Sequence, residues 1–288
     1  MSTAVSVAIS PCPNDVVIFG GWILGLVGLP GQRAAFAFED VETLNEAALA
    51  GTFDVIKVSA AMAAPLADTY AVLPAGAAFG FGAGPKLVVR QDFTGRPRSV
   101  AVPGLRTTAA TLLRAALAEE GADAVLPVPD AVFSPVRYDA IVDAVREGRA
   151  EAGLLIHETA LAAADHGLRR ILDLGEWWQA REPVSPVPLG VILARKSLGE
   201  ARLAAIDGVI RQSLLAAKAA PGDVAPLARL LAREKNEAVI WAHIAAYVGE
   251  LSLRMGETGR RALSVLADVA RLGRFPAASP LPAPDQCC

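Results

Sequence analysis

Short apolar segments alternate with helical stretches along most of the chain, and this alternation limits the folds that it can adopt. Residues 3–9 (TAVSVAI) and 53–59 (FDVIKVS) are rich in β-branched side chains and predict buried strands. Strands that alternate with helices predict an α/β fold, with a mainly parallel sheet and helices on both faces. Further strands are expected at 36–39, 86–90, 99–102, 151–156, 170–174 and 188–194, and helices at 41–50, 60–67, 107–119, 138–147 and from 198 onward.

Two segments repeat one pattern. Residues 51–54 lead into an apolar strand that ends at Ser59, and residues 148–151 lead into one that ends at His157. Ligands of open α/β sheets bind beyond the carboxyl ends of the strands. Two facing halves would therefore place Ser59 and His157 on opposite walls of one cleft. The alternative is that any two strand–helix units look alike, and the residues alone leave both interpretations open.

Charge and composition exclude several classes of protein. The 288 residues contain 27 Lys+Arg and 30 Asp+Glu, a formal net charge of −3, so no basic stripe is available to bind nucleic acid. The longest uncharged run, residues 16–32, contains five glycines and one proline and falls short of the ~20 apolar residues of a membrane span. Asp15 precedes it and no basic residue does, so we expect no signal peptide and a cytoplasmic location. Cys12, Cys287 and Cys288 form no disulfide framework, which fits a reducing compartment.

The three histidines differ in their surroundings. They show no HxH, HExxH or Cys-His spacing, so no metal site is expected. His243 lies in the middle of a helical stretch, where a packed structural role is favoured, and His166 lies in a turn. His157 ends an apolar run, where a partly desolvated imidazole stays neutral near pH 7, as a general base requires.

Two loops invite a ligand interpretation. Residues 80–84 (GFGAG) precede a strand, whereas a dinucleotide loop joins a strand to a helix, so these glycines are expected to let the backbone pass close to a ligand or another segment. After the strand at 99–102, Thr107 and Thr108 open a helix. Free amides and hydroxyls at such a position can bind an anion, and simple capping of the helix is the alternative.

Taken together, these segments resemble the 1,4-dihydroxy-6-naphthoate synthases of the futalosine route to menaquinone. The similarity covers nearly the whole chain, and only the Pro-rich tail after Phe275 lies outside it. The motifs that carry it are residues 10–15 (SPCPND), 40–45 (DVETLN), 57–59 (KVS), 101–104 (AVPG) with 107–108 (TT), 151–158 (EAGLLIHE), 173–178 (DLGEWW), 188–190 (PLG) and 239–243 (VIWAH).

The resemblance implies a two-lobed periplasmic-binding-protein-like (type II) fold with a ligand cleft between the lobes. It implies a lyase that converts cyclic dehypoxanthine futalosine to 1,4-dihydroxy-6-naphthoate and releases the sugar-derived fragment. No metal or organic cofactor is expected. Carried over by position, His157 matches the proton acceptor, and the substrate-contacting segments are Lys57, Val58 and Ser59, and Thr107, Thr108 and Ala109.

The lobes are expected at residues 1–86 plus 194–288 and at residues 87–193, with a hinge where the chain crosses near 87–91 and 189–194. The sequence also departs from the family pattern. Val16 replaces Thr, Phe81 replaces Arg, residues 60–64 lack aromatic side chains, and residues 159–163 are nearly all small. These changes predict a pocket lining that is smaller and less polar than in the family.

Two other functions remain open. A chorismate dehydratase of the same pathway would share the fold, but the SPCPND start and the strand ending at His157 count against it. A non-catalytic small-molecule-binding protein would also share the fold, and the expected lack of a signal peptide counts against that. The expected partner is a small-molecule substrate that carries a carboxylate, and the oligomeric state stays open.

Overall fold

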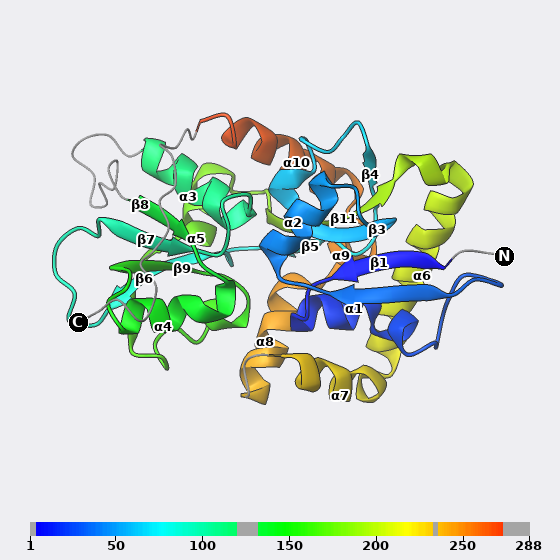
Figure 1. Cartoon of the computed structure of the whole chain (residues 1–288), viewed down its shortest axis with the longest axis horizontal. Coiled ribbons are helices and arrows are strands. Elements are labelled where there is room, and N and C mark those ends of the chain that lie inside the picture. Colours follow the sequence, from blue (N-terminus) through cyan, green and yellow to red (C-terminus); the bar gives the residue numbers. More distant parts are fainter. Residues whose placement is uncertain (1–3, 120–131, 233–235, 273–288) are drawn as a thin grey trace.

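Two β-sheets lie side by side in the computed structural model, each with helices packed against it (Figure 1). The structure describes residues 4–119, 132–232 and 236–272. The strand order is β2-β1-β3-β11-β4 in the first sheet, where β5 also pairs with β11, and β10-β6-β9-β7-β8 in the second. The α/β class expected from the sequence is confirmed. We call the first sheet with its helices the first lobe, and the second sheet with its helices the second lobe.

The first lobe takes both ends of the described chain. Its strands are β1 (Val5–Ile9), β2 (Ala34–Phe38), β3 (Val55–Ser59), β4 (Tyr70–Val72), β5 (Ala78–Gly80) and β11 (Val187–Arg195). Its helices are α1 (Pro13–Ile23), α2 (Val41–Leu49), α6 (Glu200–Ala219), α7 (Pro221–Leu231), α8 (Glu237–Tyr247), α9 (Glu250–Leu253) and α10 (Gly256–Val269), with 3-10 turns at Ala60–Met62 and Lys196–Leu198.

The second lobe is formed by the middle of the chain. Its strands are β6 (Lys86–Arg90), β7 (Ser99–Val102), β8 (Val132–Pro135), β9 (Ala152–Leu155) and β10 (Leu168–Asp173). Its helices are α3 (Thr108–Glu119), α4 (Ile141–Arg146) and α5 (Leu174–Arg181), with 3-10 turns at Tyr138–Ala140 and Glu158–Ala160. None of the helices in the described ranges is long and apolar enough to cross a membrane.

Helices cover both faces of each sheet, and the strands therefore carry apolar side chains on both faces. In β1, Val5, Val7 and Ile9 pack into the cluster that α1 and α6 cover, while Ala8 belongs to the cluster on the opposite face. A strand buried on both faces shows an uninterrupted apolar run rather than an alternating one. This explains why the strands were visible in the sequence.

The expectation of a mainly parallel sheet is wrong, because both sheets are mixed. β1 pairs in parallel with β2 and β3, and β7 does so with β8 and β9. β11 runs antiparallel to β3, β4 and β5, and β6 runs antiparallel to β9 and β10. Two neighbouring strands can run parallel only if a crossover connection joins them within the same lobe. The segments that lead into β6 and β11 come from the other lobe, and these two strands pair antiparallel with their neighbours. The helix expected at residues 60–67 is also only one 3-10 turn, Ala60–Met62.

The chain changes sheets earlier than the sequence predicted at both crossings. β5 lies in the first sheet and β6 in the second, so the first crossing is residues 81–85. β11 is already in the first sheet at Val187, so the second crossing is residues 182–186. By sheet membership, residues 187–193 therefore belong to the first lobe and not to the second.

The glycine-rich loop lies at the first crossing and touches another segment, as expected. A Cβ on Gly84 would lie 2.7 Å from the amide nitrogen of Gly175, and one on Gly175 would lie 2.6 Å from that of Gly84. The two backbones therefore approach closely only because neither residue has a side chain. The contact fixes the crossing against the start of α5.

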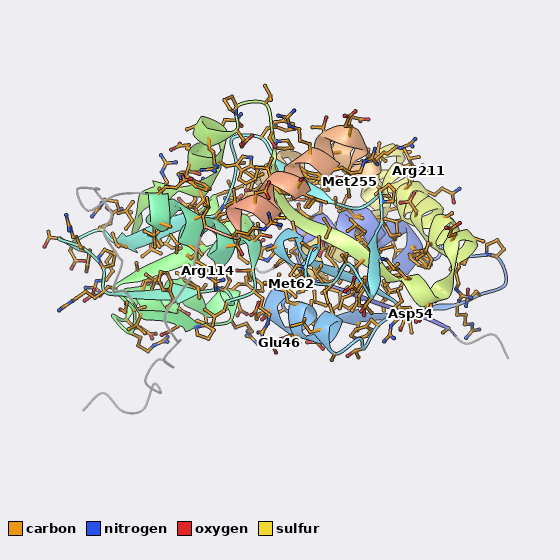
Figure 2. The ribbon with its side chains drawn as sticks, turned by 90° about the horizontal axis from the view of Figure 1, so that it is seen from above. Glu46, Asp54, Met62, Arg114, Arg211 and Met255 are labelled. Atoms are coloured by element: carbon orange, nitrogen blue, oxygen red, sulfur yellow. The ribbon has the colours of Figure 1, made fainter. Side chains whose placement is uncertain are left out.

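One hydrophobic cluster continues from one lobe into the other. It includes Ile56 and Met62 from the first lobe, and Leu112 and Trp178 from the second. Met62 lies near the boundary between the lobes, as the view from above shows (Figure 2). The lobes are thus packed together along one side, and the pocket described next lies between them.

Candidate functional site

A single pocket between the lobes gathers all the site residues that the sequence predicted. Its cavity volume is about 90 Å³, below the roughly 300–1,000 Å³ typical of small-molecule sites. Ser59 ends β3 on one side and His157 follows β9 on the other, so the strand ends face one cleft. The predicted residues in the lining are Lys57, Val58, Ser59, Thr107, Thr108, Ala109 and His157.

Ser59 is held by Asn45 of α2. The backbone amide of Ser59 donates to Asn45 Oδ1 at 2.9 Å, and Asn45 Nδ2 donates to Ser59 Oγ at 3.1 Å. Both residues are buried. Since Ser59 Oγ accepts in this contact, its own proton remains available to a group in the pocket.

Lys57 and Asp15 form a buried ion pair in the pocket wall. Lys57 Nζ donates to Asp15 Oδ1 at 2.7 Å and to the Gly76 carbonyl at 3.0 Å. The other carboxylate oxygen, Asp15 Oδ2, accepts from the amide and the hydroxyl of Ser10. An ammonium has three donors, so Lys57 retains one for a ligand. Gly190 makes room for this side chain, because a Cβ there would lie 2.9 Å from Lys57 Cε.

The two threonines at the start of α3 have different partners. Thr107 Oγ1 accepts from the Ala110 amide at 3.1 Å and donates to the Gly104 carbonyl at 2.9 Å, so its hydroxyl caps the helix. Thr108 Oγ1 donates to the Leu189 carbonyl at 3.0 Å and accepts from the Ala61 amide at 3.2 Å. These partners of Thr108 lie in the first lobe, so its hydroxyl joins the lobes at the pocket edge.

Cys12 also lines the pocket but is a poor nucleophile. Its thiol is buried, and burial, reinforced by the negative charge of Asp15, raises its pKa. The thiolate is the reactive form of cysteine. Covalent chemistry at Cys12 is therefore disfavoured.

His157 is in an unusual backbone conformation directly after β9. Its φ of 56° is the only positive value among the non-glycine residues of the described ranges. Such strained positions concentrate at functional sites. The Nε2 atom is buried and has no hydrogen-bond partner, and the ring lies edge-on to Tyr138, with 4.8 Å between ring centroids.

Burial lowers the pKa of His157, and the nearby carboxylates of Glu158, Asp15 and Asp40 oppose this effect. The imidazole is therefore neutral near pH 7 and can accept a proton. This matches the state that the sequence predicted for His157.

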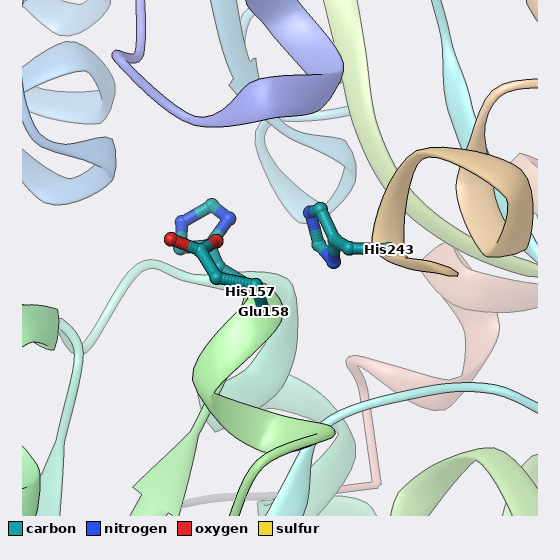
Figure 3. A group of neighbouring side chains, drawn as sticks. All are labelled: His157, Glu158 and His243. Atoms are coloured by element: carbon teal, nitrogen blue, oxygen red, sulfur yellow. The ribbon is translucent and has the colours of Figure 1, made fainter. Parts of the chain in front are cut away.

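His243 faces His157 across the cleft, and sequence reasoning missed this. It lies in α8, it is 1% exposed, and it lines the same pocket. Its ring centroid is 6.2 Å from that of His157 and 4.9 Å from that of Tyr247, and Figure 3 shows the two imidazoles beside one another. Neither ring nitrogen of His243 has a hydrogen-bond partner. Burial lowers its pKa well below the ordinary value and raises that of Tyr247 to about 12.

The positions that depart from the family pattern lie outside the pocket lining. Val16 is fully buried in α1, and Phe81 is 62% exposed at the first crossing. Residues 60–64 and 159–163 are likewise absent from the lining. The expectation of a smaller and less polar lining than in the family stays a prediction, since small side chains at these positions do not reach the pocket.

Relatives of known activity cover almost the full chain. A protein of Thermus thermophilus named 1,4-dihydroxy-6-naphthoate synthase is 41% identical over 280 residues, which are 97% of this chain and 98% of the relative. A protein of Streptomyces coelicolor with the same name is 37% identical over 281 residues, which are 96% of each chain.

Solved structures support the two-lobed fold. Protein AF1704 from Archaeoglobus fulgidus superposes with a TM-score of 0.84 at 30% identity, covering 93% of this chain and 97% of its own. The alkanesulfonate-binding protein of Xanthomonas axonopodis superposes with a TM-score of 0.67 at 15% identity over 96% of each chain. The second likeness concerns the fold alone and confirms the periplasmic-binding-protein-like architecture.

The sequence model of a family described as menaquinone biosynthesis matches residues 5–272, which include every pocket residue described above. This chain therefore belongs to the menaquinone biosynthesis family.

Proposed function

We propose that this protein is a 1,4-dihydroxy-6-naphthoate synthase, a carbon–carbon lyase that acts on cyclic dehypoxanthine futalosine. The two relatives that bear this name support the assignment. The observation that carries it is the placement of a neutral imidazole, His157, whose Nε2 has no hydrogen-bond partner, in a pocket that also offers hydrogen-bond donors. Such a pocket suits a substrate that is held by an anionic group and loses a proton elsewhere.

His157 is the proposed general base. Cleavage that leaves an aromatic dihydroxynaphthoate requires the removal of a proton, and aromatisation then makes the step favourable. Two other groups in the pocket are less suited to this role: Lys57 is paired with Asp15, and the Cys12 thiol is protonated because burial raises its pKa. A neutral imidazole with an unpartnered Nε2 fits the role.

Ser59 and the first turn of α3 are the proposed site for the carboxylate. Ser59 has a hydroxyl proton to donate, and the first amides of a helix have no partner within the helix. Ala109 and Thr108 contribute amides from that turn, where the helix dipole favours negative charge. Because the Thr107 hydroxyl caps the helix, we assign its role to shaping the turn and not to direct contact through Oγ1.

Binding is proposed to close the two lobes around the ligand. The two crossings, residues 81–85 and 182–186, are the hinge, and the bonds from Thr108 to Leu189 and Ala61 bridge the lobes beside it. As an enzyme that makes a quinone precursor from a small polar substrate, the protein is expected to act in the cytoplasm without nucleic acid.

The deciding experiment supplies two substrates separately. Purified protein is incubated with cyclic dehypoxanthine futalosine or with chorismate, and the products are separated by liquid chromatography and identified by mass. Formation of 1,4-dihydroxy-6-naphthoate from the first supports the proposal. Formation of an enolpyruvyl benzoate from chorismate would instead identify a chorismate dehydratase. Saturable binding of the first substrate without turnover would identify a binding protein.

A further inference from the structure

Three potential metal ligands meet in the cleft although they are distant in sequence. One donor atom each from His157, Glu158 and His243 lies within 4.8 Å of the other two (Figure 3). Glu158 and His243 are buried, and His157 is partly buried. Because 85 residues separate Glu158 from His243 in the chain, a search for short ligand spacings cannot find this group.

The donor set is that of a transition-metal site. Two imidazoles and one carboxylate suit Zn²⁺ and similar ions, and three protein ligands leave a coordination position for water or another oxygen. Imidazole nitrogens bind metal in their neutral form. His157 Nε2 and both nitrogens of His243 have no hydrogen-bond partner to give up.

The surrounding charges also favour a cation. The carboxylates that act on the His157 ring are Glu158, Asp15 and Asp40, and the opposing charge is the Lys57 ammonium. Because Lys57 is already paired with Asp15, its ammonium opposes a cation beside the ring less than an unpaired ammonium would.

From this geometry we propose that His157, Glu158 and His243 form a zinc-binding site that competes with the substrate. When zinc–ligand bonds are ~2.0–2.1 Å long, the ligand atoms of a tetrahedral site lie about 3.3 Å from one another. The three donor atoms here lie up to 4.8 Å apart, so they would move closer on binding. Because His157 and Glu158 come from the second lobe and His243 from the first, the ion would draw the lobes together. Zinc would also occupy the proposed base. The competition rests on the proposed function, whereas the binding itself does not.

The test measures binding directly and without turnover. Protein freed of metal with EDTA is titrated with Zn²⁺ by calorimetry and with Co²⁺ by visible absorption. All measurements use a Cys287→Ser/Cys288→Ser background, because adjacent thiols also take zinc. We expect one equivalent bound, with Co²⁺ bands of a four- or five-coordinate site and no thiolate charge-transfer band.

Four variants decide the assignment. His157→Gln, Glu158→Gln and His243→Gln should each weaken binding at least tenfold, whereas His166→Ala, the matched control, should leave it unchanged. Circular dichroism verifies that each variant is folded, and only folded variants are compared. Absence of binding in the parent protein, binding retained in either His157→Gln or His243→Gln, or equal weakening in His166→Ala would overturn the proposal.

Inhibition gives the second readout. Zn²⁺ should raise the apparent KM for cyclic dehypoxanthine futalosine and leave kcat unchanged at saturating substrate. If the protein does not turn over this substrate, the proposed function fails but the binding data still decide the zinc site. If the protein turns over the substrate and bound zinc does not inhibit, competition at this site is overturned.

Discussion

Two groups of polar side chains face the same pocket and differ in how their hydrogen bonds are used. The anchored cluster, on the first-lobe wall, consists of Ser10, Asp15, Asn45, Lys57 and Ser59, which bond to one another or to backbone. The histidine pair, His157 and His243, leaves three ring nitrogens without a hydrogen-bond partner. His243 is as deeply buried as the anchored cluster, so burial alone does not explain the difference.

This difference distinguishes the side chains that fix the shape of the pocket from those that are available to bind a ligand. A buried polar atom without a partner costs about 1–3 kcal/mol, so a fold retains such atoms only where something else supplies the partner. The anchored cluster is satisfied without a ligand and fixes the shape of its wall. The histidine pair leaves three ring nitrogens available to a substrate or an ion.

The largest expected effect comes from removing the proposed base. His157→Ala should lower kcat on cyclic dehypoxanthine futalosine by about 10²–10⁴-fold, the usual contribution of a positioned base. Product affinity should change little, since the carboxylate is proposed to bind Ser59 and the first turn of α3 and not His157. His166→Ala, which removes the histidine at the turn beside β10, is the control and should keep full activity. Near-normal turnover in His157→Ala would exclude this residue as the base.

The second effect concerns stability and tests the anchored cluster. Asp15→Ala leaves the Lys57 ammonium buried without its partner and should lower the free energy of unfolding by about 3–5 kcal/mol. Adding Lys57→Met removes the unpaired charge and should restore part of that loss. Urea unfolding of both variants measures the two values. A double variant that is less stable than the single one would show that the pair does not act as a unit.

The smallest expected effect is the change of stability with pH that the titration of the histidine pair causes. Burial lowers the pKa of both rings in the folded state, so the unfolded chain binds more protons below its ordinary histidine pKa of about 6.5. The free energy of unfolding should therefore fall as the pH drops below this value, by at most about 1.4 kcal/mol per pH unit for each ring.

His243→Gln isolates the contribution of one ring. Its unfolding free energy should fall less steeply than that of the parent between pH 6.5 and pH 5, while the carboxylates titrate alike in both proteins. Urea unfolding at several pH values gives the two slopes. Parallel slopes would mean that His243 has the same pKa in the folded and the unfolded state.

Elements with strong local signals were predictable from the sequence. The apolar runs that became β1, β3 and β9 are buried on both faces, and their ends indicated Ser59 and His157. His243 was not predictable, because a histidine on a helix shows no sign of what packs against it from residues 86 positions away. The antiparallel pairing of β11 was hidden for the same reason, since long-range pairing leaves no local pattern.

The buried Cys12 thiol gives this protein an internal reporter of motion. Its sulfur borders the pocket yet is only 5% exposed, and burial keeps it protonated. An alkylating reagent can therefore modify it only during moments when the lobes separate or α1 shifts. In a chain whose tail cysteines are replaced by serine, the rate at which Cys12 is labelled would report how often the cleft opens. A bound ligand that keeps the cleft closed would lower this rate.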